Sequence, residues 1–334
     1  MDNYNVNNNC QLSVANCQFN KEKYRLLCQT EESIPIFSRD WWLDLVCGEK
    51  YWDVLIIEKN NRITATFPVY LPSPGVISMP PYTQTMGPWF APEIEIQKPN
   101  LLQTRKQDLL KLFLCELKKY PYFLQNFHHS IQDWLPFYWE KYKQTTRYTY
   151  ILENIQDFES IWSGMSGDIH RNIKKAGNKY QIEVKKGVAV EELLQILTQT
   201  FNRQDLSPKH LHVLKNLIQK CRERGQGDIW GGYDPQGRLH AAVFVAWQQS
   251  SAYYLAGGGN PQLRKSGAHS LTLWESIRSV SAHTSTFDFE GSMLPGVEYF
   301  FRGFGGKQTP YFTIFKGEMS LLYKAWLKFK NRIR

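Results

Sequence analysis

Residues 287–316 read FDFEGSMLPGVEYFFRGFGGKQTPYFTIFK, and they hold more polar groups inside an apolar frame than any other stretch of the chain. The first four residues alternate apolar and acidic side chains, which is the pattern of a half-buried strand. Gly291 ends that strand, and Pro295 begins a short helix. A second strand follows over residues 311–315. The stretch therefore predicts a strand–helix–strand unit with a polar site in it.

An earlier part of the chain repeats this order of elements. Residues 138–142 (YWEKY) stand where the later half has residues 300–304 (FFRGF). Residues 61–65 (NRITA) match residues 237–241 (GRLHA) in the same way. Two copies of one mixed α/β domain explain this pattern better than one long domain, and the length of 334 residues suits about two domains. Only the later copy keeps the carboxylate pair and the glycines, so we expect the reacting centre there.

The pattern of hydrophobic residues and turns predicts five segments, each domain being a mixed β-sheet flanked by helices. The expected segments are a flexible tail over 1–20, a first domain over 21–155, a basic linker helix region over 156–189, a second domain over 190–317 and a basic C-terminal helix over 318–334.

The charge of the chain favours acidic partners. Its formal net charge is +9, which suits nucleic acid, phosphorylated ligands or an anionic membrane surface. The charge does not distinguish among these three classes of partner.

The cysteine and hydropathy patterns predict a cytoplasmic location. The six cysteines are scattered without a Cys-x-x-Cys pair, which predicts free thiols in a reducing compartment. The N-terminus lacks the charged and apolar regions of a signal peptide, and no stretch has the ~18 consecutive apolar residues of a membrane span. The eight histidines show no metal-ligand spacing, so no metal site is expected.

A glycine-rich segment leads into a predicted helix in the second copy. Gly257, Gly258 and Gly259 precede the sequence RKSGAH at residues 264–269. Free backbone N–H groups and the positive end of a helix bind anions, and glycine allows a ligand to approach closely. The segment resembles the loop with which GNAT acyltransferases hold a pyrophosphate. The resemblance implies these donor-binding residues: Gly257, Gly258, Arg264, Lys265, Ser266 and Gly267. The alternative is an ordinary helix start with Ser266 as its N-cap.

The opening stretch has a sharper resemblance. The sequences FDFEGS at 287–292 and FFRGFGG at 300–306 are similar to the C-terminal signature of the Fem-type peptidyltransferases, also called the methicillin-resistance or peptidoglycan-bridge family. The basic run 171–176 resembles the link into that family's second domain. The resemblance implies two GNAT-like domains, with the acceptor on the first and the donor on the second. It also implies transfer of an aminoacyl group from tRNA, or of an acyl group from acyl-CoA, to an amine on a cell-wall precursor.

The resemblance also implies roles for individual residues. The family's Phe-Lys pair, whose lysine stabilises charge at the reacting carbonyl, matches Phe301 and Arg302. Arginine keeps the charge but has a different, forked geometry. Phe304 and Gly305 join Phe301 as further donor-binding candidates. The acceptor-binding candidates are Tyr82, Trp89, Arg171 and Lys174; Tyr82 and Trp89 lie in a proline- and aromatic-rich loop that simple packing explains equally well.

Two carboxylates complete the expected catalytic set. Acyl transfer to an amine passes through an oxyanion, which a cation such as Arg302 stabilises, and the amine must lose a proton. Asp288 and Glu290 alternate along the predicted strand and would share one face of it. We therefore expect Arg302, Asp288 and Glu290 to be catalytic. The alternative is that the two carboxylates form structural ion pairs with Arg302 or Lys307.

The sequence thus predicts an acyltransferase with no permanently bound cofactor. The co-substrate would be acyl-CoA or aminoacyl-tRNA, and the acceptor an amine of a small molecule, a cell-wall precursor or a sugar-linked compound. The basic C-terminal helix would either dock on its own domain or contact a membrane peripherally. The alternative function is a non-catalytic, degenerate GNAT-like protein that binds RNA or an anionic membrane surface.

Overall fold

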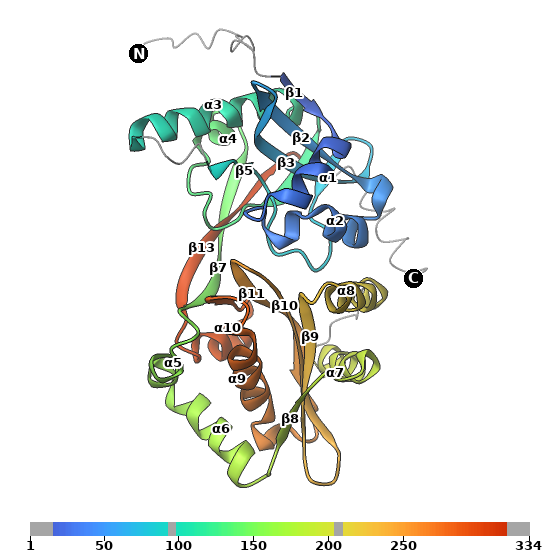
Figure 1. The fold of residues 1–334 in the computed structure, drawn as a ribbon, viewed down its shortest axis with the longest axis vertical. Coiled ribbons are helices and arrows are strands. Elements are labelled where there is room, and N and C mark those ends of the chain that lie inside the picture. Colours follow the sequence, from blue (N-terminus) through green and yellow to red (C-terminus); the bar gives the residue numbers. More distant parts are fainter. Residues whose placement is uncertain (1–15, 93–97, 204–209, 319–334) are drawn as a thin grey trace. The chain divides into compact units, whose positions relative to one another are not determined.

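The computed structural model describes residues 16–92, 98–203 and 210–318 (Figure 1). The chain forms two compact units. The first consists of residues 1–146 and 311–334, and the second of residues 147–310.

The first unit is a mixed sheet with helices packed against it. Its elements in chain order are β1 (Asn16–Phe19), α1 (Lys21–Thr30), α2 (Asp40–Cys47), β2 (Trp52–Lys59), β3 (Arg62–Ser73), β4 (Val76–Ser78), β5 (Trp89–Phe90), α3 (Pro99–Leu117), β6 (Tyr122–Asn126), α4 (Leu135–Trp139) and the start of β7 (Lys143–Glu153). β2 and β3 form an antiparallel hairpin. Asn60 and Asn61 form its turn with φ angles of 52° and 60°, the left-handed conformation that two-residue hairpin loops require.

The second unit has the same construction. Its elements are the rest of β7, α5 (Phe158–Gly164), α6 (Gly167–Asn178), β8 (Glu183–Lys186), α7 (Val190–Arg203), α8 (Leu211–Glu223), β9 (Gly227–Tyr233), β10 (Leu239–Gln248), β11 (Ser251–Gly259), the 3-10 turn η4 (Arg264–Ser266), α9 (Ala268–Val280), β12 (Thr286–Asp288), α10 (Pro295–Arg302) and the start of β13 (Lys307–Lys316). The strand order is β7-β12-β11-β10-β9-β8. Figure 1 shows α9 on one face of β9–β11 and α7 with α8 on the other.

The two halves of the chain share one order of elements, which confirms the predicted repeat. From β1 to β7 and again from β8 to β13, the helices and main strands follow as β-α-α-β-β-β-α-β-α-β, with the two-residue β5 as an addition in the first half. Each half also has one parallel pair at the same point, β4 with β6 and β11 with β12. The fold is therefore α/β with two tandem copies of a mixed sheet flanked by helices.

The last strand of each copy pairs outside its own half of the sequence. Residues 313–316 of β13 pair antiparallel with β6 in the first unit, and residues 151–153 of β7 pair antiparallel with β12 in the second. The compact units consequently divide at Thr146 and Arg147, and not at the expected boundaries of 155 and 190.

The core of the second unit lies between its sheet and helices α5, α6, α9 and α10. Phe287 and Phe289 are fully buried there against Phe301 and Phe304. Burying one such side chain contributes about 1.5–3 kcal/mol. Because Ile169 and Ile173 of α6 also belong to this core, the segment 156–189 is part of the second unit and is not a linker.

Three further expectations need correction. Residues 16–19 of the expected tail form strand β1, which pairs with β2. Residues 257–259 belong to β11 and do not form a loop. Cys115 takes part in a disulfide, whereas Cys17, Cys28, Cys47 and Cys221 are free thiols as expected.

Two expectations concern the membrane. Among the described residues, no helix has the length and apolar character that crossing a bilayer requires. The predicted C-terminal helix lies outside the described residues from position 319 onward.

Candidate functional site

The two parallel strands β11 and β12 of the second unit share only a short hydrogen-bonded pairing. β11 and β12 pair only at Ala252 with Phe287 and at Tyr253 with Asp288, and β11 then continues to Gly259 while β12 ends. A separating pair leaves backbone N–H and C=O groups of the longer strand without a strand partner on that side, and such groups bind the amides of an extended ligand. This stretch of β11 without a β12 partner, called the opening between β11 and β12 below, is therefore a candidate ligand site.

Asp288 and Glu290 meet at the end of β12. Asp288 is 2% exposed, and its Oδ1 accepts hydrogen bonds from the Thr149 hydroxyl and, at 2.7 Å, from the backbone N–H of Glu290. The expectation that both carboxylates lie on one strand is wrong, because Glu290 follows the strand with a φ of 58°. The left-handed turn at Glu290, and not a shared strand, brings its carboxyl group near that of Asp288.

Glu290 carries an unsatisfied polar atom. Its Oε1 is buried without a hydrogen-bond partner. Burial, and secondarily the charge of Asp288, raise the pKa of the Glu290 carboxyl well above its usual value. A buried carboxyl of raised pKa, with one oxygen unpaired, can take up a proton at neutral pH.

Arg302 has partners of its own on α10. Its Nε lies 3.1 Å from Glu298 Oε1, and its guanidinium lies 5.5 Å from the centre of the Tyr299 ring. The same Glu298 oxygen accepts a hydrogen bond from Tyr150, whose hydroxyl accepts another from Gln308 at 3.1 Å. The Arg302 side chain is 58% exposed, so the cation remains available to a ligand.

The carboxyl pair and Arg302 face opposite sides of β7. Thr149 bonds Asp288, and the next residue, Tyr150, bonds Glu298, the partner of Arg302. Successive side chains of a strand point to opposite faces of its sheet. The sequence predicted one common centre for the three candidate catalytic residues. The contacts with β7 instead put Asp288 on one face of the sheet and Arg302 on the other.

Close packing within the chain explains the glycines of β11. A Cβ on Gly257 would lie 2.5 Å from the Tyr254 hydroxyl, and one on Gly258 would lie 2.4 Å from Thr200 Oγ1. Tyr254 also hydrogen-bonds His269 Nε2 at 3.2 Å, a pair that the sequence did not indicate. These glycines therefore bring β11 against its own neighbours beside the opening.

The start of α9 differs in detail from the expectation. The N-cap is Gly267 and not Ser266, and its φ of 79° requires glycine. A Cβ at Gly267 would also lie 2.6 Å from the backbone oxygen of Asn172 on α6. Arg264 and Lys265 are exposed on η4 directly before this helix start, where an anion would meet their charges.

Ser266 is buried and joins a hydrogen-bonded chain with His240 and Asp234. The sequence indicated this hydrogen-bonded group only through the repeat, in which His240 stands where the first copy has Thr64.

The other donor candidates support the site from inside the core. Phe301 and Phe304 are buried, and Gly305 approaches the backbone of Gly164, with a φ of 82°. Phe301 and Phe304 therefore pack the core under α10, whereas Gly305 is exposed.

The acceptor candidates are distributed over both units. In the first unit, Trp89 is buried with its N–H donated to Ser33, and burial raises the pKa of Tyr82 to about 12. In the second unit, Arg171 and Lys174 are exposed on α6. Trp89 is thus a packing residue, as the alternative interpretation held.

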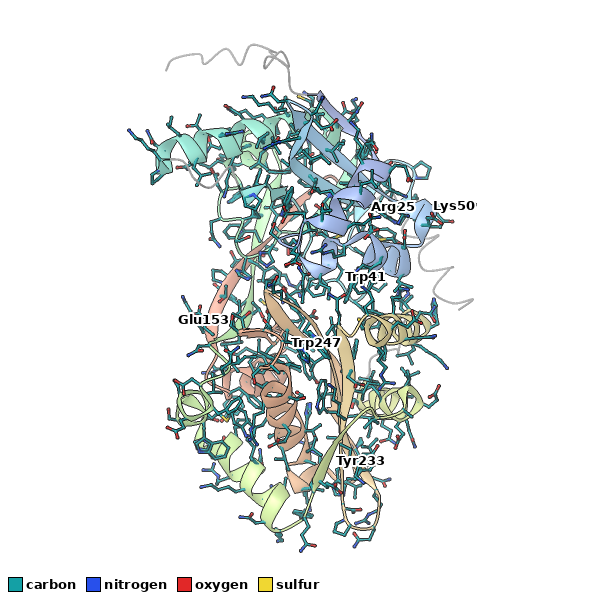
Figure 2. All side chains as sticks on the ribbon, in the orientation of Figure 1. Arg25, Trp41, Lys50, Glu153, Tyr233 and Trp247 are labelled. Carbon is teal, nitrogen blue, oxygen red and sulfur yellow. The ribbon has the colours of Figure 1, made fainter. Side chains whose placement is uncertain are left out.

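Neither of two cavities in the second unit includes a candidate catalytic residue. The larger, of about 550 Å³, lies beside β8, and Tyr233, labelled in Figure 2, lines it with Lys185 and Glu192. The smaller, of about 290 Å³, lies between α7 and residues 260–263. Among the described side chains, no group of three or more His, Cys, Asp or Glu residues could hold a metal ion.

Comparisons with known proteins agree with this geometry. Residues 164–302 match the family model of the acetyltransferase (GNAT) domain. Among solved structures, FemX superposes with a TM-score of 0.64 at 10% identity, over 90% of this chain and 97% of that chain. A tandem GNAT protein from the clavulanic acid biosynthesis pathway superposes with a TM-score of 0.52 at 9% identity, over 90% and 98% of the two chains.

The C-terminal domain of a putative lysylphosphatidylglycerol synthetase from Agrobacterium fabrum has a TM-score of 0.50 at 8% identity, over 81% and 85% of the two chains. Comparison with curated protein sequences gave no match. The second unit thus carries a GNAT acetyltransferase domain, in a chain that has the fold shared by FemX and a tandem GNAT protein.

Proposed function

We propose that this protein is an N-acyltransferase that moves an acyl or aminoacyl group from an activated donor to an amine. The observation that carries the proposal is the short pairing of β11 with β12 next to the half-buried side chain of Glu290, whose Oε1 has no hydrogen-bond partner. The edge of β11 beyond Tyr253 has no β12 partner, and donor and acceptor would meet there from the two faces of the sheet.

The donor would bind on the α9 face. Arg264 and Lys265 precede the start of α9, and the positive end of this 13-residue helix adds to their attraction for phosphate. Both acyl-CoA and aminoacyl-tRNA carry phosphate groups and a reactive carbonyl. The match of residues 164–302 to a GNAT acetyltransferase domain favours acyl-CoA, whereas the resemblance to Fem-type enzymes favours aminoacyl-tRNA.

The acceptor amine would approach from the face that holds Asp288 and Glu290. The amine nitrogen attacks the carbonyl carbon, a C–N bond forms, and the nitrogen loses a proton to the Glu290 carboxylate. The C–S or C–O bond to the leaving group then breaks, and the thiolate or alkoxide leaves and takes up a proton. Burial, and secondarily the negative charge of Asp288, raise the pKa of Glu290, so its carboxylate form is the stronger base.

Arg302 would stabilise the carbonyl oxygen. It lies on the face opposite the carboxyl pair, so a carbonyl held between the strands meets the cation on one side and the attacking amine on the other. A positioned cation lowers the energy of the oxyanion that forms in this step. Glu298 and Tyr150 fix the direction of the guanidinium.

We further propose that the acceptor is an amine of a cell-wall precursor or another sugar-linked compound. Arg171 and Lys174 are exposed on α6, which packs beside α9, so they would meet phosphate groups that enter from the donor face. The test is to incubate the purified protein with radiolabelled acetyl-CoA and, separately, with aminoacyl-tRNA, each with a UDP-linked muramyl peptide or glucosamine. Label should move to the amine from one donor and not from the other. No transfer from either donor to either acceptor would contradict the proposal.

A second candidate is a non-catalytic protein that binds RNA or an anionic membrane. The exposed basic residues of α6 favour it. Salt-dependent RNA binding without any transfer product would support this candidate, whereas a labelled product would exclude it.

A further inference from the structure

A buried chain of three polar side chains lies beneath the start of α9. His240 Nε2 lies 3.0 Å from Asp234 Oδ2, and His240 Nδ1 lies 2.9 Å from Ser266 Oγ. The exposed fractions are 6% for Asp234, 3% for His240 and 1% for Ser266. Burying polar groups costs free energy unless each is hydrogen-bonded, so such a chain specifies one local arrangement.

The donors and acceptors fix the direction of every bond in the chain. Bonds from the backbone N–H of Arg238, from His240 and from the Arg238 side chain outweigh burial and hold the pKa of Asp234 well below its usual range. Asp234 is therefore a carboxylate and only accepts, so Nε2 of His240 donates to it. In the tautomer that carries its proton on Nε2, Nδ1 accepts from the Ser266 hydroxyl. Ser266 Oγ itself accepts the backbone N–H of Ala268 at 3.2 Å.

The chain of hydrogen bonds therefore ends at Ala268, the first residue of α9. Ser266 lies between Lys265 and the left-handed Gly267, so its position sets the path of the turn that carries both candidate phosphate-binding cations. Ser266 is too deeply buried to reach a substrate, which excludes a role as a nucleophile.

Among the described residues, only the second copy of the repeat has this chain of hydrogen bonds. At the position that corresponds to His240, the first copy has Thr64, whose hydroxyl donates to the backbone oxygen of Ile57 at 3.1 Å. Hydrogen bonds that only stabilised a β-hairpin would be equally useful in both copies. Its restriction to the copy with the GNAT domain connects it to binding of the donor.

We propose that Asp234, His240 and Ser266 are positioning residues that hold residues 264–267 in the conformation that receives the donor's phosphate. This inference rests on the proposed acyltransferase function. It predicts that breaking the chain weakens donor binding and leaves the chemical step intact, because none of the three side chains touches the reacting atoms.

The test is a steady-state analysis of Ser266→Ala and Asp234→Asn with the donor that the wild type uses, at saturating acceptor. Each variant should raise the KM for the donor about tenfold, which corresponds to about 1.4 kcal/mol, and leave kcat within about twofold. Thr64→Ala is the matched control at the corresponding position of the first copy and should leave the donor KM unchanged. Melting temperatures and direct binding of the donor's phosphate-bearing product separate weakened binding from unfolding.

The outcomes distinguish the two proposals. Transfer with an unchanged donor KM in both folded variants would overturn the positioning role alone. A fall in kcat at unchanged KM would also overturn it. Failure of the wild type to transfer from any donor would overturn the proposed function and the positioning role together.

Discussion

The backbone N–H of Glu290 donates a 2.7 Å hydrogen bond to the carboxylate of Asp288, so that one acidic residue orients the next. This bond forms as the chain leaves β12 in a left-handed turn at Glu290. The raised pKa of Glu290 favours its neutral form in the folded protein, which lowers the repulsion between this carboxyl and the carboxylate of Asp288. The hydrogen bond also makes Asp288 the structural member of the pair and Glu290 the member with a free oxygen.

Replacing Glu290 by Gln should abolish most of the transfer activity. The loss of a general base typically lowers the rate by about 10²–10⁴-fold. The melting temperature should stay equal to or above that of the wild type, since a buried ionisable group is removed. Steady-state kinetics and thermal denaturation measure both effects. Glu183→Gln, at an exposed carboxylate of β8, is the matched control and should retain full activity.

The stability of the protein should depend on pH through Glu290. Its pKa is raised in the folded state, so the folded protein holds the proton more tightly than the unfolded chain. The contribution to stability is fully present below the unfolded pKa of about 4.3 and is lost as the pH rises through the folded pKa. Urea denaturation at several pH values should show Glu290→Gln gaining stability over the wild type across that window. Parallel curves for both proteins would show that the carboxyl has an ordinary pKa.

Thr149→Val should destabilise the second unit. The hydroxyl of Thr149 donates to the buried Asp288, and losing a hydrogen bond to a charged group costs about 1.5–3 kcal/mol. Valine has nearly the same shape, so packing is preserved. The free energy of unfolding from urea denaturation measures the change. Thr286→Val, whose hydroxyl donates to a backbone oxygen near the surface, should cost clearly less.

Arg302→Ala should lower the rate strongly and leave the fold intact. The ion pair with Glu298 is solvent-exposed, and such pairs contribute only about 0–1 kcal/mol to stability. Loss of one oxyanion-stabilising group costs about 10²–10³-fold in kcat. Arg302→Lys, which keeps the charge without the fork, tests whether geometry matters. Unchanged turnover in Arg302→Ala would remove this residue from the mechanism.

Gly267→Ala should destabilise the start of α9. The left-handed conformation costs a non-glycine residue about 1–2 kcal/mol, and the new Cβ would collide with the backbone of Asn172. Gly177→Ala in α6 is the control, because that position has open space and a helical backbone, and alanine there should add about 0.5 kcal/mol. Chemical denaturation of both variants should give effects of opposite sign.

The order of helices and strands could be predicted from the sequence because local sequence patterns determine it. Pro295 marked a helix start, residues 311–315 marked a strand, and the alignment of 61–65 with 237–241 marked the repeat. Each signal depends on residues close together in the chain, where turn chemistry and hydrophobic period act directly.

The features that the sequence did not predict depend on long-range pairing. The glycines 257–259 resemble a loop, but pairing with β10 extends β11 through all three of them. The pairing of β13 with β6 and of β7 with β12 joins segments more than 130 residues apart. The faces to which Arg302 and Asp288 point follow from their contacts with β7, which no local pattern encodes.

The most direct test of the account is to detect the acylated amine by mass spectrometry after incubation of the wild type and Glu290→Gln with isotope-labelled donor and amine acceptor. The account predicts labelled product from the wild type, with acetyl-CoA or with aminoacyl-tRNA, and at least a hundredfold less from the variant. Equal product from both proteins would contradict the role of Glu290. No product from the wild type with either donor would contradict the central claim that the opening between β11 and β12 is a site of acyl transfer.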